Sequence, residues 1–445
     1  MKKTKLTIQL LAIALAFGCA VTPPGHDTAA QIQSAASLAN AIEFHTEALP
    51  AEAAAAADRL TLSAALERAL RQSPEVQIAL AEVRVAQAGT HQARLLPNPV
   101  LDIAFRLPES GGRTVIEAGL TAELTQLLQR PRRISAADTA LRAASAKAVT
   151  TVLNVMHETQ QNYFDAVGLR RETQILIQRN SRLGELLKVT EARLAAGEGT
   201  KLDVATLKAE QATADIDLGD VTLKIRRAHF SLAHRLGQPR GRIDWILATP
   251  LFTQIALRGE PDAIAHGLRV RPEIQADRWQ LAALEDQTAL ARLAWMENNA
   301  AGLAAERDSD WSLGPSVVLP LPIFDWGQAK RSRARAQAID ARQRLTQTTR
   351  QVAREIRQAH DAVAQLMTTT RQARTQLVPL HEERVRLARV IFDAGQEDVT
   401  KLHLAELDLL GAQLRLVRLE HRTALAIIAL DRATGGSTED KPNDQ

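Results

Sequence analysis

The sequence predicts a mainly α-helical protein with a small β part, built from two copies of one helical unit. The composition is rich in Ala and Leu and only 3% aromatic, which favours long helices over the many loops of a typical enzyme. Stretches without Gly or Pro run far beyond the length of an ordinary globular helix. Short motifs also recur in the same order in the two halves of the chain.

The N-terminus predicts an export signal followed by a lipid anchor. A basic "MKKTK" precedes "LTIQLLAIALAFG", which is too short for a comfortable transmembrane helix, so residues 1–18 are expected to be a signal peptide. The segment "LAFGC" resembles a bacterial lipobox and predicts lipidation of Cys19, although Ala16 stands where Leu is usual. Ala20 favours the outer membrane, because Asp there would resemble an inner-membrane retention signal. A chance cysteine in a discarded peptide is the alternative.

Three motif pairs define the internal repeat. "SPEVQIALAEV" matches "RPEIQADRWQL", "LLQRPRRISAADTALRAA" matches "LPIFDWGQAKRSRARAQA", and "TKL" occurs after a Gly in both halves. Each half is expected to run short helix, Pro, helix, extended region, very long helix, Gly corner, helix. With Cys19 as the only cysteine, internal disulfides are excluded and packing must provide stability. The predicted segments are an extended leader at 19–58, repeats at 59–237 and 261–435, a linker at 238–260 and a disordered tail at 436–445.

Each repeat contains a helix of unusual length. From Pro131 to Ala196 only Gly168 and Gly184 interrupt the pattern, so that a helix there would be on the order of 100 Å long. The stretch 328–393 is similar, broken only by Pro379. Charges recur every few residues, which excludes a membrane-spanning helix.

The helices after the two corners show small and apolar residues at coiled-coil spacing, so each corner is expected to be the tip of a long antiparallel hairpin. Gly197 and Gly395 are expected to end their helices, and Thr200 and Asp398 to cap the returning ones. The predicted seam positions are Leu202, Ala205, Ala209, Ala212, Ile216, Gly219 and Leu223 in the first helix, and Leu402, Ala405, Leu409, Ala412, Leu416, Leu419 and Thr423 in the second.

Four short segments alternate between apolar and polar residues, as strands with two different faces do. A soluble hairpin resting on a helix is one interpretation, and a transmembrane barrel with a polar lumen is the other. Four strands cannot close a barrel, and an open edge in lipid leaves backbone groups without partners, so a barrel would need several chains. The strands are expected at about 99–107, 114–124, 299–307 and 311–319.

Taken together, these features resemble the TolC-type outer-membrane efflux proteins over nearly the whole mature chain. The phased repeats, "LLPNP" before the first strand, "LPIFDWGQAKRS" after the last and the two Gly corners carry the resemblance. It implies a homotrimer in which long coiled-coil hairpins form an α-helical barrel across the periplasm. Each chain would give four strands to a twelve-stranded β-barrel in the outer membrane of a Gram-negative bacterium.

The resemblance implies a passive export conduit and no enzyme, cofactor or resident metal. Its partners would be outer-membrane lipid, a periplasmic adaptor (membrane fusion) protein and an inner-membrane pump of the RND type. Interspersed charges and a net charge of +4 indicate no nucleic-acid partner. "PNP" and the short overall form resemble the heavy-metal branch, which favours heavy-metal cations as cargo. Drug or solvent efflux, type I secretion, and a lipid-anchored periplasmic coiled-coil scaffold are the alternatives.

The resemblance places a gate and an adaptor-docking surface at the two corners. Carboxylates at such tips would form rings under three-fold symmetry and favour cations between them. His403 stands where the first corner has Asp203, so a simple acidic ring is in doubt, and capping of helix N-termini is the alternative role. The candidate residues are Gly197, Thr200, Asp203, Asp393, Gly395, Glu397, Asp398 and Lys401.

Overall fold

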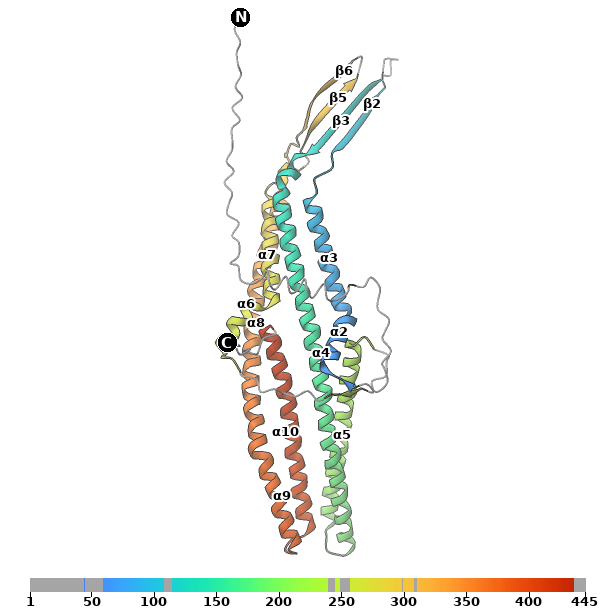
Figure 1. Ribbon diagram of the computed structural model, residues 1–445, viewed down its shortest axis with the longest axis vertical. Coiled ribbons are helices and arrows are strands. Elements are labelled where there is room, and N and C mark those ends of the chain that lie inside the picture. The colour runs from blue at the N-terminus through green and yellow to red at the C-terminus, as the bar shows by residue number, and fades with distance from the viewer. Residues whose placement is uncertain are drawn as a thin grey trace, which may run out of the picture.

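The computed structural model describes residues 44, 59–107, 114–238, 245–248, 257–297, 299–307 and 310–435. It is an elongated molecule with a four-stranded sheet at one end and two helical hairpin tips at the other (Figure 1). The predicted signal peptide, Cys19 with most of the leader, and the predicted tail lie outside the described residues. Within the described ranges, no helix combines the length and the apolarity that a bilayer crossing needs.

The two halves of the chain build the same series of elements. The first half contains β1 (Arg59–Leu60), α2 (Leu62–Gln72), α3 (Pro74–Arg94), β2 (Val100–Arg106), β3 (Val115–Glu123), α4 (Leu124–Ala195) and α5 (Lys201–Arg235). The second contains β4 (Ile246–Leu247), α6 (Glu260–Val270), α7 (Pro272–Ala291), the 3₁₀ turn η1 (Ala294–Met296), β5 (Ala300–Arg307), β6 (Trp311–Val318), α8 (Gln328–Gln372), the π-helix η2 (Ala373–Leu377), α9 (Val378–Asp393) and α10 (Val399–Thr434).

The two helix breaks before a proline are built differently. In the first repeat Ser73 caps α3, and its hydroxyl accepts a hydrogen bond from the Val76 N–H at 3.4 Å. Pro74 occupies the first helical position, where a missing N–H costs nothing. In the second repeat Arg271 stands before Pro272, and its buried guanidinium donates to the carbonyls of Arg432 and Ala433 at 3.1 and 3.0 Å. This arginine therefore ties the start of α7 to the end of α10.

All four strands of the main sheet are antiparallel, in the order β2-β3-β5-β6 (Figure 1). The β3–β5 pair joins the two repeats, so the two hairpins form one sheet. The register places apolar residues of all four strands on one face, as the alternation predicts. That face carries Leu101, Ile103, Phe105, Ile116, Leu120, Leu303, Trp311, Leu313 and Val317, with Arg307 at its end. The opposite face carries Asp102, Arg106, Glu117, Thr121, Glu306, Ser312 and Ser316.

Below the sheet, the long helices lie side by side in the order α5, α4, α10 and then α8 with α9 (Figure 1). The largest buried cluster lies at mid-height, where α2 and the β1–β4 pair pack on α4 and α5. Tyr163 of α4 is fully buried there, with its hydroxyl oxygen 2.8 Å from the Leu60 carbonyl oxygen and 2.7 Å from that of Ala248. The hydroxyl thus fixes both short strands against the long helix.

The long helices differ from expectation at their prolines. α4 spans 72 residues and begins at Leu124, so Pro131 lies inside it, and its length is about 110 Å. The second long helix does not end at Pro379. It passes through the five-residue π-helix η2 just before that proline, which accommodates the missing N–H and the bulk of the ring.

The predicted coiled-coil seam is correct in α10 and wrong in α5. In α10, Leu402, Ala405 and Ala412 are buried and the other four positions are half-buried. In α5 all seven predicted positions are exposed. The start of each returning helix explains the error. Thr200 is itself the N-cap of α5, whereas Thr400 lies two residues after Asp398, the N-cap of α10. A two-residue shift turns a helix by about 200°, which places the same stripe on the opposite side.

The true inner face of α5 follows from that shift. Its buried residues include Val204, Leu207, Ala214 and Val221, and the last three belong to clusters with residues of α4 and α10. The stripe from Leu202 to Leu223 consequently has no partner in the described part of a single chain.

Candidate functional site

The two corners have the same backbone geometry. Gly197 and Gly395 follow α4 and α9 with φ of +84° and +68°, the left-handed region that favours glycine. Gly197 N–H donates to the Leu194 carbonyl at 3.1 Å, and Gly395 N–H donates to the Phe392 carbonyl at 2.9 Å. The N–H of the next residue in each corner donates to the carbonyl one residue earlier in the helix. This completes the pair of backbone hydrogen bonds that ends many helices. Both glycines therefore hold the positions that the sequence predicts.

Thr200 caps α5 as predicted, and Asp203 completes the cap. The Asp203 N–H donates to Thr200 Oγ1 at 3.2 Å, and the Thr200 N–H donates to Asp203 Oδ2 at 3.0 Å. The Thr200 hydroxyl lies 2.6 Å from the same carboxylate oxygen. Hydrogen bonds from the Thr200 side chain and backbone hold the pKa of Asp203 below its ordinary value. Asp203 is thus a charged capping residue, even though its position at the tip also suits a gate.

Asp398 occupies the N-cap position of α10, but its side chain does not cap the helix. It instead pairs with the guanidinium of Arg193 and accepts a hydrogen bond from the Thr400 hydroxyl at 2.7 Å. Arg193 Nη1 also donates to Thr400 Oγ1 at 3.1 Å. Because Arg193 lies in the last turn of α4, this contact joins the two tips. Asp398 therefore holds the predicted N-cap position, but its carboxylate binds Arg193 and Thr400 instead of a helix N–H.

Arg193 is the tip residue whose contacts the sequence analysis missed. A basic residue in the last turn of a helix usually serves the helix dipole, so its position alone suggested no more. The remaining candidates are exposed: Glu397 pairs with Lys401 one turn later, and Asp393 makes no ion pair within the described ranges. The carboxylates at the two tips are therefore largely neutralised or used as caps.

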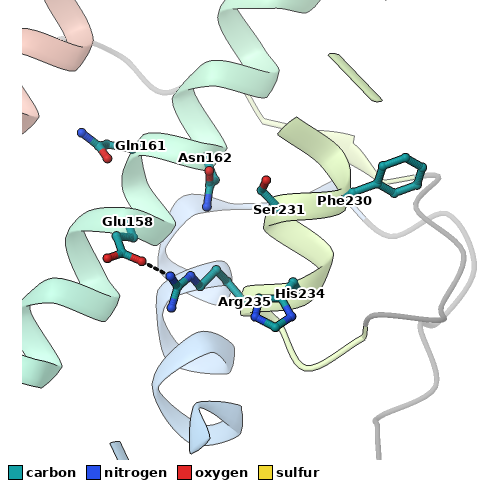
Figure 2. Close-up of a pocket in the computed structure, with 7 residues that line it drawn as sticks. All are labelled: Glu158, Gln161, Asn162, Phe230, Ser231, His234 and Arg235. Carbon is teal, nitrogen blue, oxygen red and sulfur yellow. Dashed lines mark hydrogen bonds and ion pairs between the residues drawn. The ribbon is translucent and has the colours of Figure 1, made fainter. Parts of the chain in front are cut away.

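A pocket lies between α4 and α5, away from the tips (Figure 2). It measures about 460 Å³ and is lined by Glu158, Gln161, Asn162, Phe230, Ser231, His234 and Arg235. Arg235 crosses its floor to pair with Glu158 and, at 3.0 Å, with Glu75 of α3. Its residues contain no nucleophile paired with a base. Among the described residues, no group of three or more His, Cys, Asp or Glu side chains is placed to hold a metal ion.

Comparison with known proteins identifies the fold. The family model described as "Outer membrane efflux protein" matches residues 65–238 and 266–436. The chain belongs to this family. Each matched segment ends one residue after the glycine that follows its last helix, which is Gly237 after α5 and Gly435 after α10.

Two curated relatives resemble this efflux protein over most of their length. The cobalt-zinc-cadmium resistance protein CzcC of Cupriavidus metallidurans is 23% identical over 401 residues, covering 88% of this chain and 93% of that protein. The outer membrane efflux protein BepC of Brucella suis is 23% identical over 409 residues, covering 86% of each. The outer membrane protein VceC of Vibrio cholerae has a similar crystal structure, with a TM-score of 0.68 at 22% identity, covering 85% of this chain and 97% of that one.

Membership of the family indicates how the sheet and the hairpin tips of this efflux protein relate to the outer membrane. A sheet with one apolar face suits an outer membrane, and the hairpin tips then point into the periplasm. Proteins of this family are channels through which export occurs.

Proposed function

We propose that this chain forms the homotrimeric outer-membrane conduit of a tripartite export system. The observation that carries the proposal is the four-stranded sheet with one apolar face and two unpaired edges, β2 and β6. Exposed edges in lipid leave backbone N–H and C=O groups without partners, so the sheet must be closed by further copies. Three copies would make a barrel of twelve strands, within the range known for outer-membrane barrels.

The helices support the same assembly. Within one chain, α10 of the second hairpin packs against α4 of the first. Because the two hairpins are repeats of one unit, the equivalent contact joins α8 and α9 of one copy to α5 of the next. The exposed stripe on α5, from Leu202 to Leu223, supplies the surface that this contact would cover. Repeating the contact around three chains closes a hollow ring of six hairpins.

The tips are the proposed gate and adaptor-docking surface. Gly197 and Gly395 fix the direction of the two corners, and Thr200 with Asp203 secures the start of α5. Asp393, Glu397, Asp398 and Lys401 would face neighbouring hairpins or the periplasmic adaptor. Asp393 is the carboxylate best suited to line a constriction, because the other three charges already have partners.

Heavy-metal cations are the proposed cargo, driven by an RND-type pump in the inner membrane. The relative CzcC is named for cobalt, zinc and cadmium resistance, which supports this choice. The polar face of the sheet has a charge that suits cations, because among its described residues the carboxylates of Asp102, Glu117, Glu123 and Glu306 outnumber the guanidinium of Arg106. The name of BepC gives no cargo, and drug or solvent efflux stays as the second candidate. Lipidation of Cys19 would hold the chain to the outer membrane.

Native mass spectrometry of detergent-extracted protein tests the assembly. We expect a trimer whose chains begin at a triacylated Cys19, and discrete conductance in planar bilayers. A monomer released without detergent would refute the conduit and favour a periplasmic scaffold. The variant Cys19→Ser separates the two claims, because a channel needs the trimer whether or not it carries lipid. Tolerance of zinc and cadmium in cells that carry the cognate pump and adaptor then tests the cargo.

A further inference from the structure

The helix ends directly below the four-stranded sheet carry an excess of basic side chains, here called the basic belt. The belt lies in the ranges 91–96, 124–138, 286–297 and 319–335, where α3 and α7 end and α4 and α8 begin. Its positive excess is at least as large as the formal net charge of the whole chain, +4. The basic members are Arg94, Arg130, Arg132, Arg133, Arg292, Lys330, Arg331, Arg333 and Arg335, and the acidic members are Asp138, Asp286, Glu297 and Asp325.

Contacts between the helices place the basic belt at one level. Arg132 Nη1 of α4 lies 3.0 Å from Asp286 Oδ1 of α7. Thr288 Oγ1 of α7 in turn donates to the Ala334 carbonyl of α8 at 3.3 Å. Because β3 ends at Glu123 and runs directly into α4, the belt lies within about 15 Å of the sheet.

The carboxylates of the belt already have partners, and several guanidinium groups are left over. The ion pairs at this level are Arg94–Asp138, Arg132–Asp286 and Lys330–Glu297. Arg292, Arg333 and Arg335 are exposed and make no ion pair with any residue that the structure describes. Such an excess of like charge repels itself, which disfavours the compact state. A neighbouring copy in a symmetric ring cannot supply the missing negative charge, because it presents the same basic helix ends at this level.

The level of the belt matches the headgroup zone of a bilayer that surrounds the sheet. The apolar face of the sheet suits the hydrocarbon, and headgroups extend about 5–8 Å beyond it. Long arginine side chains reach toward such a zone while their helices stay outside it. Trp295 and Trp326 are exposed at the same level, and tryptophan is enriched at membrane–water interfaces. The guanidinium of Arg331 lies 4.1 Å from the centre of the Trp326 ring.

Apolar side chains stand beside the free arginines. The segment between β6 and α8 exposes Leu321, Ile323 and Phe324, which are 79%, 72% and 90% accessible in the single chain. Arg333 follows within two turns of the start of α8. A phospholipid offers a phosphate to the arginines and an acyl chain to the apolar segment, whereas a free phosphate ion offers only the first.

We infer that the basic belt binds the headgroups of anionic phospholipids in the leaflet that faces the periplasm, and so holds the channel at a fixed depth in the outer membrane. This inference rests on the proposed membrane-embedded trimer. Anionic headgroups supply the negative charge that the belt lacks. A zwitterionic phospholipid carries a phosphate but no net charge, so it neutralises the belt less well.

Lipid binding to the purified trimer tests the inference. Protein extracted from outer membranes into detergent is titrated with palmitoyl-oleoyl phosphatidylglycerol, which is anionic, or with the matching phosphatidylethanolamine, which is zwitterionic. Native mass spectrometry counts the lipids on each trimer. The test variant is Arg333→Gln/Arg335→Gln. Two residues turn a helix by about 200°, so this variant removes charge from two sides of α8.

The matched control is Arg350→Gln/Arg354→Gln on the same helix. Both arginines are exposed and make no ion pair in the described ranges, as in the test pair. They lie about 20 Å or more further from the sheet, well beyond the Debye length of about 8 Å at physiological salt. The two variants therefore lose the same charge at different distances from the headgroups.

We expect wild type to bind phosphatidylglycerol about tenfold more tightly than phosphatidylethanolamine. The test variant should keep a preference of about threefold or less, because it loses two of the unpaired charges, and the control should stay within about twofold of wild type. Raising the ammonium acetate concentration to about 1 M should weaken the preference of wild type, because salt screens the belt.

Two outcomes overturn the inference. One is equal affinity of wild type for the two lipids, and the other is an equal loss of preference in the test and control variants. Arg292→Gln/Arg333→Gln repeats the comparison if the test variant yields no trimer. The same spectra report the number of subunits, so failure of the proposed function is distinct, with no trimer of wild type at all. That result would remove the membrane-embedded arrangement and the inference with it.

Discussion

Gly168→Ala should destabilise this protein, although the same change stabilises most helices. Gly168 lies in the middle of α4, and a Cβ there would sit 2.4 Å from Cγ of His421 on α10. The His421 ring would have to move, and its Nε2 would leave Asp165 Oδ1, which is 2.9 Å away. The glycine thus permits a close approach between the two hairpins.

The expected magnitude follows from three opposing contributions. Replacing a helical Gly by Ala favours the folded state by about 1 kcal/mol. Overpacking costs about 1–3 kcal/mol, and losing the His421 hydrogen bond costs about 1 kcal/mol more. The net effect is a loss of about 1–3 kcal/mol, opposite in sign to the helix propensity alone. Chemical unfolding in detergent, followed by circular dichroism, measures it.

Two controls make the result decisive. Gly89→Ala in α3 adds a Cβ with nothing within 4 Å, so it should stabilise by about 1 kcal/mol. Gly168→Ala/His421→Ala should be at least as stable as His421→Ala alone, because the added methyl then meets empty space. A stabilised Gly168→Ala, or a double variant that adds both losses, would refute the close-approach argument.

Three further changes test other parts of the structure. Gly302→Ala should disrupt the sheet and with it the proposed trimer in native mass spectrometry, since its Cβ would clash with the Leu120 carbonyl oxygen, whereas Gly314→Ala has open space and should leave the oligomer unchanged. Gly197→Val should weaken assembly while Gly197→Asn is tolerated, because only backbone strain at positive φ opposes the change; equal trimer yields would contradict this. Burial, and then the nearby charge of Arg432, lower the pKa of His157 in the folded protein. Because the unfolded chain then binds a proton more readily, the stability of the protein should fall as the pH drops below about 6.5. His157→Gln should therefore weaken the pH dependence of the unfolding midpoint between about pH 7 and 5.

Local patterns predicted the elements that local physics determines. The alternation in β2, β3 and β6 gave the correct faces, since a strand has a fixed period of two. Gly197 and Gly395 were correctly placed because positive φ leaves few other residues possible. These features depend on a residue and its near neighbours, so one sequence is enough to find them.

The failures have two causes, a two-residue shift of a motif relative to the start of its helix and a partner that is distant in the chain. "TKL" suggested equivalent turns, yet Thr200 caps its helix and Thr400 instead bonds Asp398 from within the first turn of α10. Two residues of offset were enough to place the α5 stripe on the wrong side. The pairing of Arg193 with Asp398 joins helices that are far apart in the chain, and no local signal names such a partner.

The β3–β5 pairing has a consequence for the order in which the chain matures. β3 belongs to the first half and β5 to the second, so the sheet cannot be completed until nearly three-quarters of the chain has crossed the inner membrane. Until then β3 presents an open edge beside a strongly apolar face, which is the kind of surface on which secreted chains aggregate. Pairing over so long a loop is also slow. We therefore expect the partly exported chain to be the stage most prone to aggregation and most open to proteases.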